Sequence, residues 1–171
     1  MLLRVVGGFL VVLGAAGAGF IKTRQYHIRL SVLKELERGM ELIRCQMNYT
    51  LYPIPKLLQI AGAQLKGQAG IYFCRLAKAI EDGVPRNRAY KVALSQMEGE
   101  LSIPNDGLLA LIEWSETLGS FDPEGENSLM SLSIDRLRKA RTNFEEDKNA
   151  MVKSYTLLGA SAGIALLILM L

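Results

Sequence analysis

VVGGFLVVLGAAGAGFI at residues 5–21, together with SYTLLGASAGIALLILML at residues 154–171, decides how this chain is organised. Each run is uncharged and has the length of a helix that crosses a bilayer, about 17–25 residues. The polar segment between them has the size of one ordinary domain. We therefore predict a transmembrane helix at 2–21, a soluble domain at 22–153 and a second transmembrane helix at 154–171.

Positive charge next to membrane spans predicts where the domain lies, because lysine and arginine near spans stay in the cytoplasm. Only Arg4 lies on the outer side of either run. The inner sides carry many basic residues: Lys22, Arg24, Arg29 and Lys34 after the first run, and Arg136, Arg138, Lys139, Arg141, Lys148 and Lys153 before the second. We expect a cytoplasmic domain with both termini outside.

A secretory signal peptide is the alternative reading of the first run. Arg4 would form its charged region, and Ala16-Gly17-Ala18 its cleavage site. The product would be an extracytoplasmic interaction domain with a C-terminal anchor. The length of the run and the cations that directly follow it favour a retained helix.

Small residues recur at four-residue spacing in both runs. Gly159 and Gly163 form a GxxxG pattern, and Gly14 and Ala18 repeat the spacing in the first run. Small residues at this spacing let helix backbones approach closely in lipid. We expect the two spans to pack through them, with each other or with neighbouring subunits in a homo-oligomer.

The segment between the runs predicts helices throughout, because its apolar residues recur at steps of three and four. A long first helix carries the stripe Tyr26, Leu30, Leu33, Leu36, Met40, Ile43 and Met47. A second helix follows Pro53-Ile54-Pro55, and a Gly67/Gly70 turn leads to a third over Ile71–Asp82.

Proline and glycine residues mark the remaining boundaries. Gly83 and Pro85 separate the third helix from a fourth, which extends to Leu101. A fifth runs from Pro104-Asn105-Asp106 to Gly119, and Asp122 caps a sixth that continues into the second apolar run. The prediction is an all-α fold: a bundle of about six helices between two transmembrane helices, the first and last helices being continuous with those spans.

Composition and motifs argue against several functions. A formal net charge of +3, without a basic stripe interleaved with aromatics, does not suggest a nucleic-acid partner. Cys45 and Cys74 form no CxxC motif, and His27 is the only histidine of the chain, so we expect no metal site. We interpret the two cysteines as buried thiols, with a disulfide as the alternative. No nucleotide-binding or hydrolase motif occurs, and we expect no cofactor and no enzymatic activity.

One acidic pair keeps an enzyme hypothesis open. Glu113 and Glu116 flank Trp114 and lie three residues apart, so they share a face of the predicted fifth helix. A carboxylate pair can bind a cation or transfer protons. No partner group is evident, and a solvated face is the simpler interpretation. His27 follows the first run among cations, where we expect an interfacial residue rather than a base.

Several patches in order along the chain resemble the stage III sporulation protein AB family. They are YTLYPIP at residues 49–55, AYKVAL at 89–94, LGSFD at 118–122 and YTLLG at 155–159. Together with the apolar ends and the long amphipathic helix, they extend the resemblance over almost the whole length. The family is similar to the cytoplasmic domains of the type II secretion F protein, an inner-membrane platform.

The resemblance implies a function that periodicity alone does not show. It implies a non-enzymatic platform in the mother-cell membrane around the forespore, within the channel that joins the two cells. Its implied partners are the sporulation AA protein, a secretion-type ATPase, and other channel proteins. As the docking surface we predict the outward charges of the two long helices: Arg38, Glu41, Arg44, Arg138, Arg141 and Glu145.

Overall fold

Six helices make up the part of the chain that a computed structural model describes, and no strand occurs there. The described backbone covers residues 2–50, 52–97, 99, 101–119 and 122–170, and side chains are described within 25–150, apart from the same gaps and residue 123. The predicted all-α fold is confirmed for these residues.

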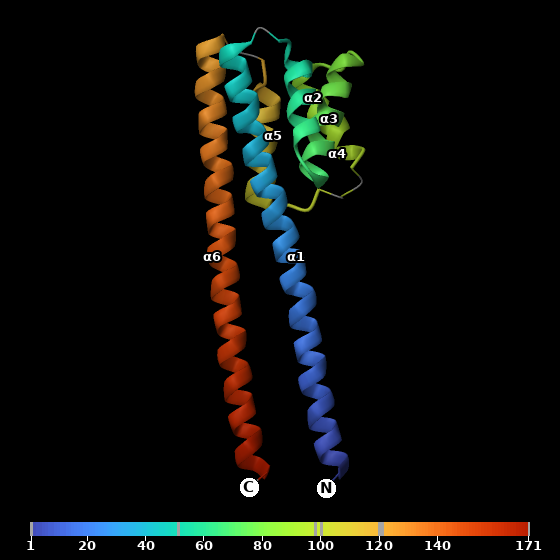
Figure 1. Cartoon of the computed structure of the whole chain (residues 1–171), viewed down its shortest axis with the longest axis vertical. Helices are drawn as coiled ribbons and strands as arrows, with labels where there is room; N and C mark the ends of the chain where they lie inside the picture. Colours follow the sequence, from blue (N-terminus) through green and yellow to red (C-terminus); the bar gives the residue numbers. More distant parts are fainter. Residues whose placement is uncertain (1, 51, 98, 100, 120–121, 171) are drawn as a thin grey trace.

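Two helices of 48 residues each, α1 (Leu2–Tyr49) and α6 (Pro123–Met170), form the frame of the molecule. At a rise of about 1.5 Å per residue, each is about 70 Å long. They lie side by side and antiparallel, with Leu2 and Met170 at the same end (Figure 1). The predicted continuity of the first and last helices with the apolar runs is confirmed.

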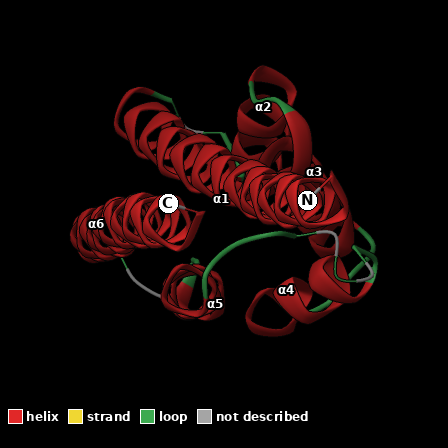
Figure 2. Ribbon diagram, turned by 90° about the horizontal axis from the view of Figure 1, so that it is seen from below, coloured by secondary structure: helices red, strands yellow, loops and turns green. Residues whose placement is uncertain are grey.

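Four short helices pack beside the halves of α1 and α6 that lie away from the chain termini (Figures 1 and 2). They are α2 (Ile54–Gln64), α3 (Gly67–Glu81), α4 (Arg86–Ser95) and α5 (Asn105–Thr117). In the view of Figure 1, helices α2, α3 and α4 lie to one side of α1, and α6 lies to the other. The short helices and the adjoining parts of α1 and α6 enclose one core.

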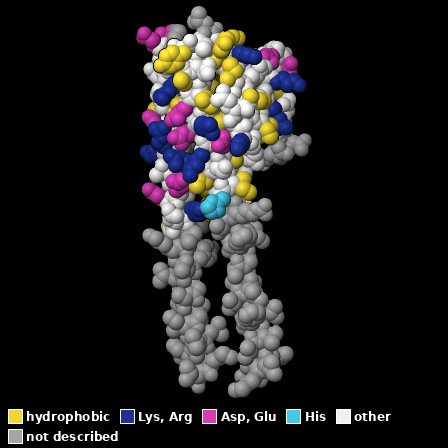
Figure 3. All heavy atoms as spheres, viewed as in Figure 1, with side chains coloured by type: hydrophobic (Ala, Val, Ile, Leu, Met, Phe, Trp, Pro, Cys, Tyr) yellow, Lys and Arg dark blue, Asp and Glu magenta, His cyan; other side chains and the backbone are white. Residues whose placement is uncertain are grey.

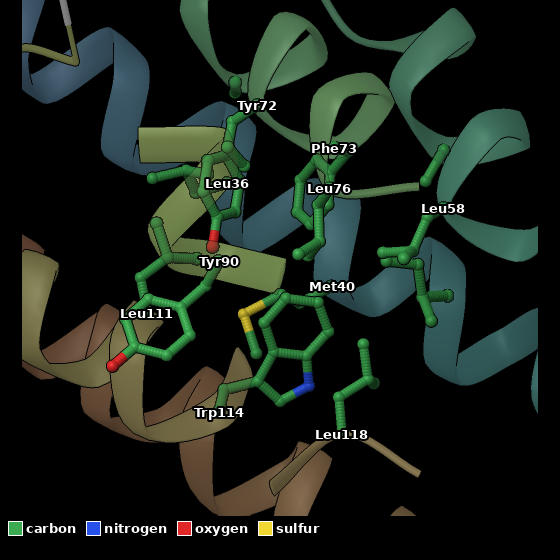
Figure 4. Close-up of a cluster of buried hydrophobic side chains, with 14 of the residues drawn as sticks. Leu36, Met40, Leu58, Tyr72, Phe73, Leu76, Tyr90, Leu111, Trp114 and Leu118 are labelled. Atoms are coloured by element: carbon green, nitrogen blue, oxygen red, sulfur yellow. The ribbon is translucent and has the colours of Figure 1, made fainter. Parts of the chain in front are cut away.

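Large side chains from α1, α2, α3, α4 and α5 fill that core (Figure 4). Leu36 and Met40 of α1 and Phe73 of α3 are fully buried, and Trp114 of α5 is only 2% exposed. Phe73 and Trp114 meet edge to face with their ring centroids 5.9 Å apart, a favoured geometry for aromatic pairs. The stripe predicted for the first long helix is buried at Leu33, Leu36, Met40 and Ile43. This confirms the face of α1 that turns inward.

Local signals set most helix ends. Gly83 and Gly119 have φ values of 88° and 72°, which glycine adopts readily, and they follow the ends of α3 and α5 as predicted. The side chain of Asp122 accepts a hydrogen bond from the backbone N–H of Gly125 at 3.2 Å. This contact confirms the predicted N-cap of α6.

Two predicted boundaries are wrong. The fourth helix ends at Ser95 and not at Leu101, because Gly99 adopts a φ of 77° and the backbone N–H of Ser102 donates to the side chain of Gln68 at 2.9 Å. The third helix begins at Gly67 and not at Ile71. Only Gly67, with a φ of 64°, lies in the turn, whereas Gly70 belongs to the helix and is buried against α2.

Within the residues searched for membrane spans, which are limited to the described part, none of the helices is long and apolar enough to cross a bilayer. The apolar runs at 5–21 and 154–171 lie outside the residues whose side chains are described. So do Gly14, Ala18, Gly159 and Gly163. The predicted spans and their packing faces stay predictions.

Candidate functional site: the charged seam between the long helices

A network of charged side chains joins α1 to α6 in the part nearest the bundle. We call it the charged seam, and its residues are Lys34, Glu37 and Glu41 of α1 and Asp135, Arg138, Arg141 and Glu145 of α6. Dark blue and magenta side chains gather over these two helices in Figure 3. The seam contains four of the six residues that the sequence suggested, all except Arg38 and Arg44, and adds Lys34, Glu37 and Asp135.

Glu37 is the centre of the seam. Its Oε1 accepts a hydrogen bond from Nε of Arg138 at 2.9 Å, and its Oε2 accepts one from Nε of Arg141 at 3.1 Å. Its side chain is only 13% exposed, whereas that of Arg138 is 46% exposed. The hydrogen bond that Arg138 donates to Glu37 is the main cause that raises the pKa of Arg138. One carboxylate therefore orients two guanidinium groups.

The outer members of the network extend it in both directions. Arg138 also pairs with Glu41 at 3.0 Å and with Asp135 at 3.1 Å. Glu145 forms ion pairs with Arg141 at 3.5 Å and with Lys34 at 3.4 Å. These pairs are more exposed to water, so each contributes little by itself. Their shared geometry matters more, because it fixes which residues of the two helices lie opposite each other.

Contacts beyond the seam keep the same antiparallel register. Toward the α1 C-terminus, Arg44 donates to Ser131 at 2.9 Å and Asn127 donates to Asn48 at 2.5 Å. In the other direction, the rings of Tyr26 and Phe144 stack with their centroids 5.0 Å apart. Lys148 lies 3.2 Å from Nε2 of His27, and since lysine can only donate, this ring nitrogen is the acceptor. The long helices are aligned from residue 26 to residue 48 of α1.

The local sequence explains why these side chains meet. Residues 34, 37, 41, 44 and 48 of α1 follow steps of three and four, which place them on one edge of the helix beside the buried stripe. On α6, residues 138, 141 and 145 do the same. The sequence analysis did not single out Glu37, because its spacing resembles that of the other charged residues on the same edge of the helix. Its position one residue after buried Leu36 was the signal available.

The predicted docking residues therefore have two kinds of environment. Glu41, Arg44, Arg138, Arg141 and Glu145 all contact the opposite long helix, as described above. Arg38 is exposed, and no ion pair or hydrogen bond of its side chain occurs within the described residues. The five engaged residues therefore join the two long helices, and whether they or Arg38 contact a partner stays a prediction.

The acidic pair of α5 bonds to two different neighbours. Glu113 pairs with Arg136 of α6, and Glu116 accepts a hydrogen bond from the hydroxyl of Tyr90 on α4 at 2.5 Å. The two residues lie three positions apart on α5, as predicted, but their side chains reach different neighbouring helices, α6 and α4. The hydrogen bond between the Tyr90 hydroxyl and Glu116 raises the pKa of Tyr90. Both carboxylates thus connect helices, and within the described residues no cluster of potential metal ligands occurs.

The two cysteines are free and exposed, which corrects the interpretation as buried thiols and excludes the disulfide in this structure. Cys45 lies outside the buried stripe of α1, and Cys74 lies on the side of α3 that is next to Gly62 of α2. Each was placed inside from its residue type alone, because cysteine is one of the most frequently buried residues.

The fold and the seam define a class: an all-helical domain built on two long antiparallel helices whose facing edges are joined by charges. The model of the family "Stage III sporulation protein AB" matches residues 4–171. The chain therefore belongs to the stage III sporulation protein AB family, as the resemblance suggested.

A solved structure described as "Stage III sporulation protein AB (SpoIIIAB)" is similar to this chain. The two share 18% sequence identity with a TM-score of 0.66, and the match covers 72% of this chain and 98% of the other. At this identity the similarity concerns the fold. None of the curated proteins matches the chain.

Proposed function

We propose that this chain is a non-enzymatic membrane platform of the channel between mother cell and forespore, where it docks a secretion-type ATPase. Membership of the family supports a role in sporulation. The observation that carries the platform proposal is the arrangement of the long helices. Both bring their apolar runs to one end of the molecule and the bundle to the other (Figure 1).

The topology follows from the same arrangement. Two helices that enter a bilayer from one side place the bundle on that side, and the basic residues beside both runs favour the cytoplasm. The rigid register of the seam would hold the bundle at a fixed height above the lipid. A platform needs this, because a partner must find its docking surface at a constant position relative to the membrane.

Native cysteines test the topology directly. Cys45 and Cys74 are both exposed, so a membrane-impermeant maleimide reaches them wherever the bundle faces the reagent. We expect no labelling in intact protoplasts of sporulating cells and full labelling after lysis. Labelling before lysis would support the alternative, a cleaved signal peptide with an anchored external domain. It would also contradict the proposed docking of a cytoplasmic ATPase.

Co-purification tests the partner. Detergent extracts of sporulating cells should yield the sporulation AA ATPase and other channel proteins with the tagged chain. Arg38→Glu should weaken recovery of the ATPase without unfolding the chain, because the Arg38 side chain makes no described contact. Lys139→Glu, an exposed α6 cation without a described ion pair, is the matched control and should leave recovery unchanged. Equal recovery from both variants would exclude Arg38 from the docking surface, and no ATPase from the unmodified chain would contradict the platform.

A further inference from the structure

A groove of about 460 Å³ lies between α2 and α3. We call it the α2–α3 groove, and it is lined by Gly62, Leu65, Gly67, Gly70, Ile71, Cys74, Arg75 and Lys78. Ile71 is 42% exposed although it is a large aliphatic residue, and the Cys74 thiol beside it is also exposed. The function proposed above does not use this surface.

Two glycines create the floor of the groove. A Cβ on Gly70 would lie 2.8 Å from the backbone oxygen of Gly62, and one on Gly62 would lie 2.6 Å from Sγ of Cys74. Real side chains do not fit at these distances, so the backbones of α2 and α3 touch there. The close approach leaves a shallow depression with an apolar floor instead of a ridge of side chains.

Two basic residues, Arg75 and Lys78, line the groove, and no acidic residue is among those that line it. Arg75 also donates a hydrogen bond to the backbone oxygen of Gln96. Residues 54–96 contain seven basic residues, Lys56, Lys66, Arg75, Lys78, Arg86, Arg88 and Lys91, but only two acidic ones, Glu81 and Asp82. Among the described residues, every ion pair lies on α1, α5 or α6, and none includes these seven. Glu81 is itself engaged by the side chain of Gln59 at 2.7 Å.

We propose that the α2–α3 groove docks an amphipathic helical segment of a partner protein, which inserts an apolar side chain between flanking carboxylates. The apolar floor takes the inserted side chain, and Arg75 and Lys78 on the rim pair with the acids. Apolar anchors in grooves with complementary charge are a recurrent mode of helix recognition. The proposal goes beyond the platform role, since it assigns a second surface and does not depend on the ATPase.

A protein segment fits this surface better than a lipid surface. Lys56 lies near the start of α2 and Lys66 just after its end, about 15 Å apart along the helix. Helix α2 runs alongside α1 rather than across it (Figure 1). A bilayer crossed by the long helices meets one end of this surface, so it cannot neutralise cations distributed along it. A helix lying in the groove can.

Cys74 reports occupancy of the groove, and Cys45 is an internal control in the same molecule. The full chain, in nanodiscs of zwitterionic lipid, is alkylated while mass spectrometry follows both thiols. The probe is a helical peptide with leucines at positions i and i+4 flanked by glutamates. At saturation we expect it to slow alkylation of Cys74 about tenfold, equivalent to about 1.4 kcal/mol, and to leave Cys45 unchanged.

Matched variants separate docking from nonspecific attraction. Lys78→Glu should abolish protection of Cys74, whereas Lys139→Glu on α6 should retain it; both side chains are exposed, so folding is preserved. A peptide with lysines in place of the glutamates should not protect. Three results would overturn the proposal. Both peptides could protect Cys74 equally, or the acidic peptide could slow alkylation of Cys74 and Cys45 equally. Protection only by phosphatidylglycerol vesicles would indicate a site for a lipid headgroup instead.

Discussion

Arg138 of α6 donates a hydrogen bond from Nε to Oε1 of Glu37 on α1 at 2.9 Å, although 101 positions separate them in the sequence. The bond closes a long loop of the chain, because the four short helices all lie between the two residues. It also sets the register of the long helices. A platform whose two stems slid past each other would present no constant surface.

Removing the Glu37 carboxylate should destabilise the bundle. Glu37→Ala leaves Arg138 and Arg141 without their shared acceptor, and Glu37 is largely shielded from water. We expect a loss of about 1–2 kcal/mol in the free energy of unfolding. Urea unfolding of the full chain in detergent, followed by circular dichroism, measures it. Asp135→Ala is the control: it removes a 70% exposed partner of the same Arg138 and should cost less than about 0.5 kcal/mol.

A buried hydroxyl pair gives an asymmetric prediction. Tyr72 and Ser115 lie 2.8 Å apart, and the Ser115 hydroxyl donates to the carbonyl of Leu111 at 2.7 Å, so Tyr72 is the donor within the pair. Tyr72→Phe leaves the Ser115 bond to Leu111 intact and should cost about 1 kcal/mol. Ser115→Ala leaves the tyrosine hydroxyl buried without an acceptor and should cost up to about 3 kcal/mol. Thermal unfolding ranks the two, and a larger loss in Tyr72→Phe would contradict the assigned donor.

Alkaline pH should destabilise the folded chain. Burial raises the pKa of the Tyr72 phenol well above its usual value of about 10. The contribution of Tyr72 to the free energy of unfolding is complete below about pH 10. It falls as the pH rises further, because the unfolded chain then releases a proton that the folded chain keeps. The slope from Tyr72 is at most about 1.4 kcal/mol per pH unit. Unfolding midpoints measured from about pH 9 to about pH 12 should fall less steeply in Tyr72→Phe, and an unchanged slope would assign the effect to other groups.

The contact of α2 with α3 predicts intolerance at Gly70. A Cβ there would meet the backbone oxygens of Gly62 and Leu65 at 2.8 and 2.9 Å, so Gly70→Ala must push the helices apart. We expect a loss of about 1–3 kcal/mol and a change in Cys74 reactivity. Gly67→Ala is the comparison: nothing lies within 4 Å of its Cβ, and its φ of 64° costs only about 1–2 kcal/mol of local strain. Unchanged Cys74 reactivity in Gly70→Ala would show that the groove tolerates a wider separation.

The sequence predicted helix ends well where one residue decides them, as at Gly83, Gly119 and Asp122. It failed at Leu101, whose apolar spacing continued the pattern of α4 although the backbone there bonds to the Gln68 side chain 34 positions earlier. It failed at Gly70, where glycine signals a turn locally but serves the close contact of two helices. Both errors involve contacts with another part of the chain, Ser102 with Gln68 and Gly70 with Gly62, which the local residue pattern does not reveal.

What the sequence determined by itself is the inward face of α1, the number of helices and the family, because side-chain periodicity and short patches are local properties of the chain. Only the tertiary structure decided that Glu37 binds Arg138 and Arg141, that Glu113 and Glu116 reach different helices, and that Cys74 lies in a groove. The physical reason is that an ion pair or a helix contact depends on the position of both partners, and packing of the core sets those positions.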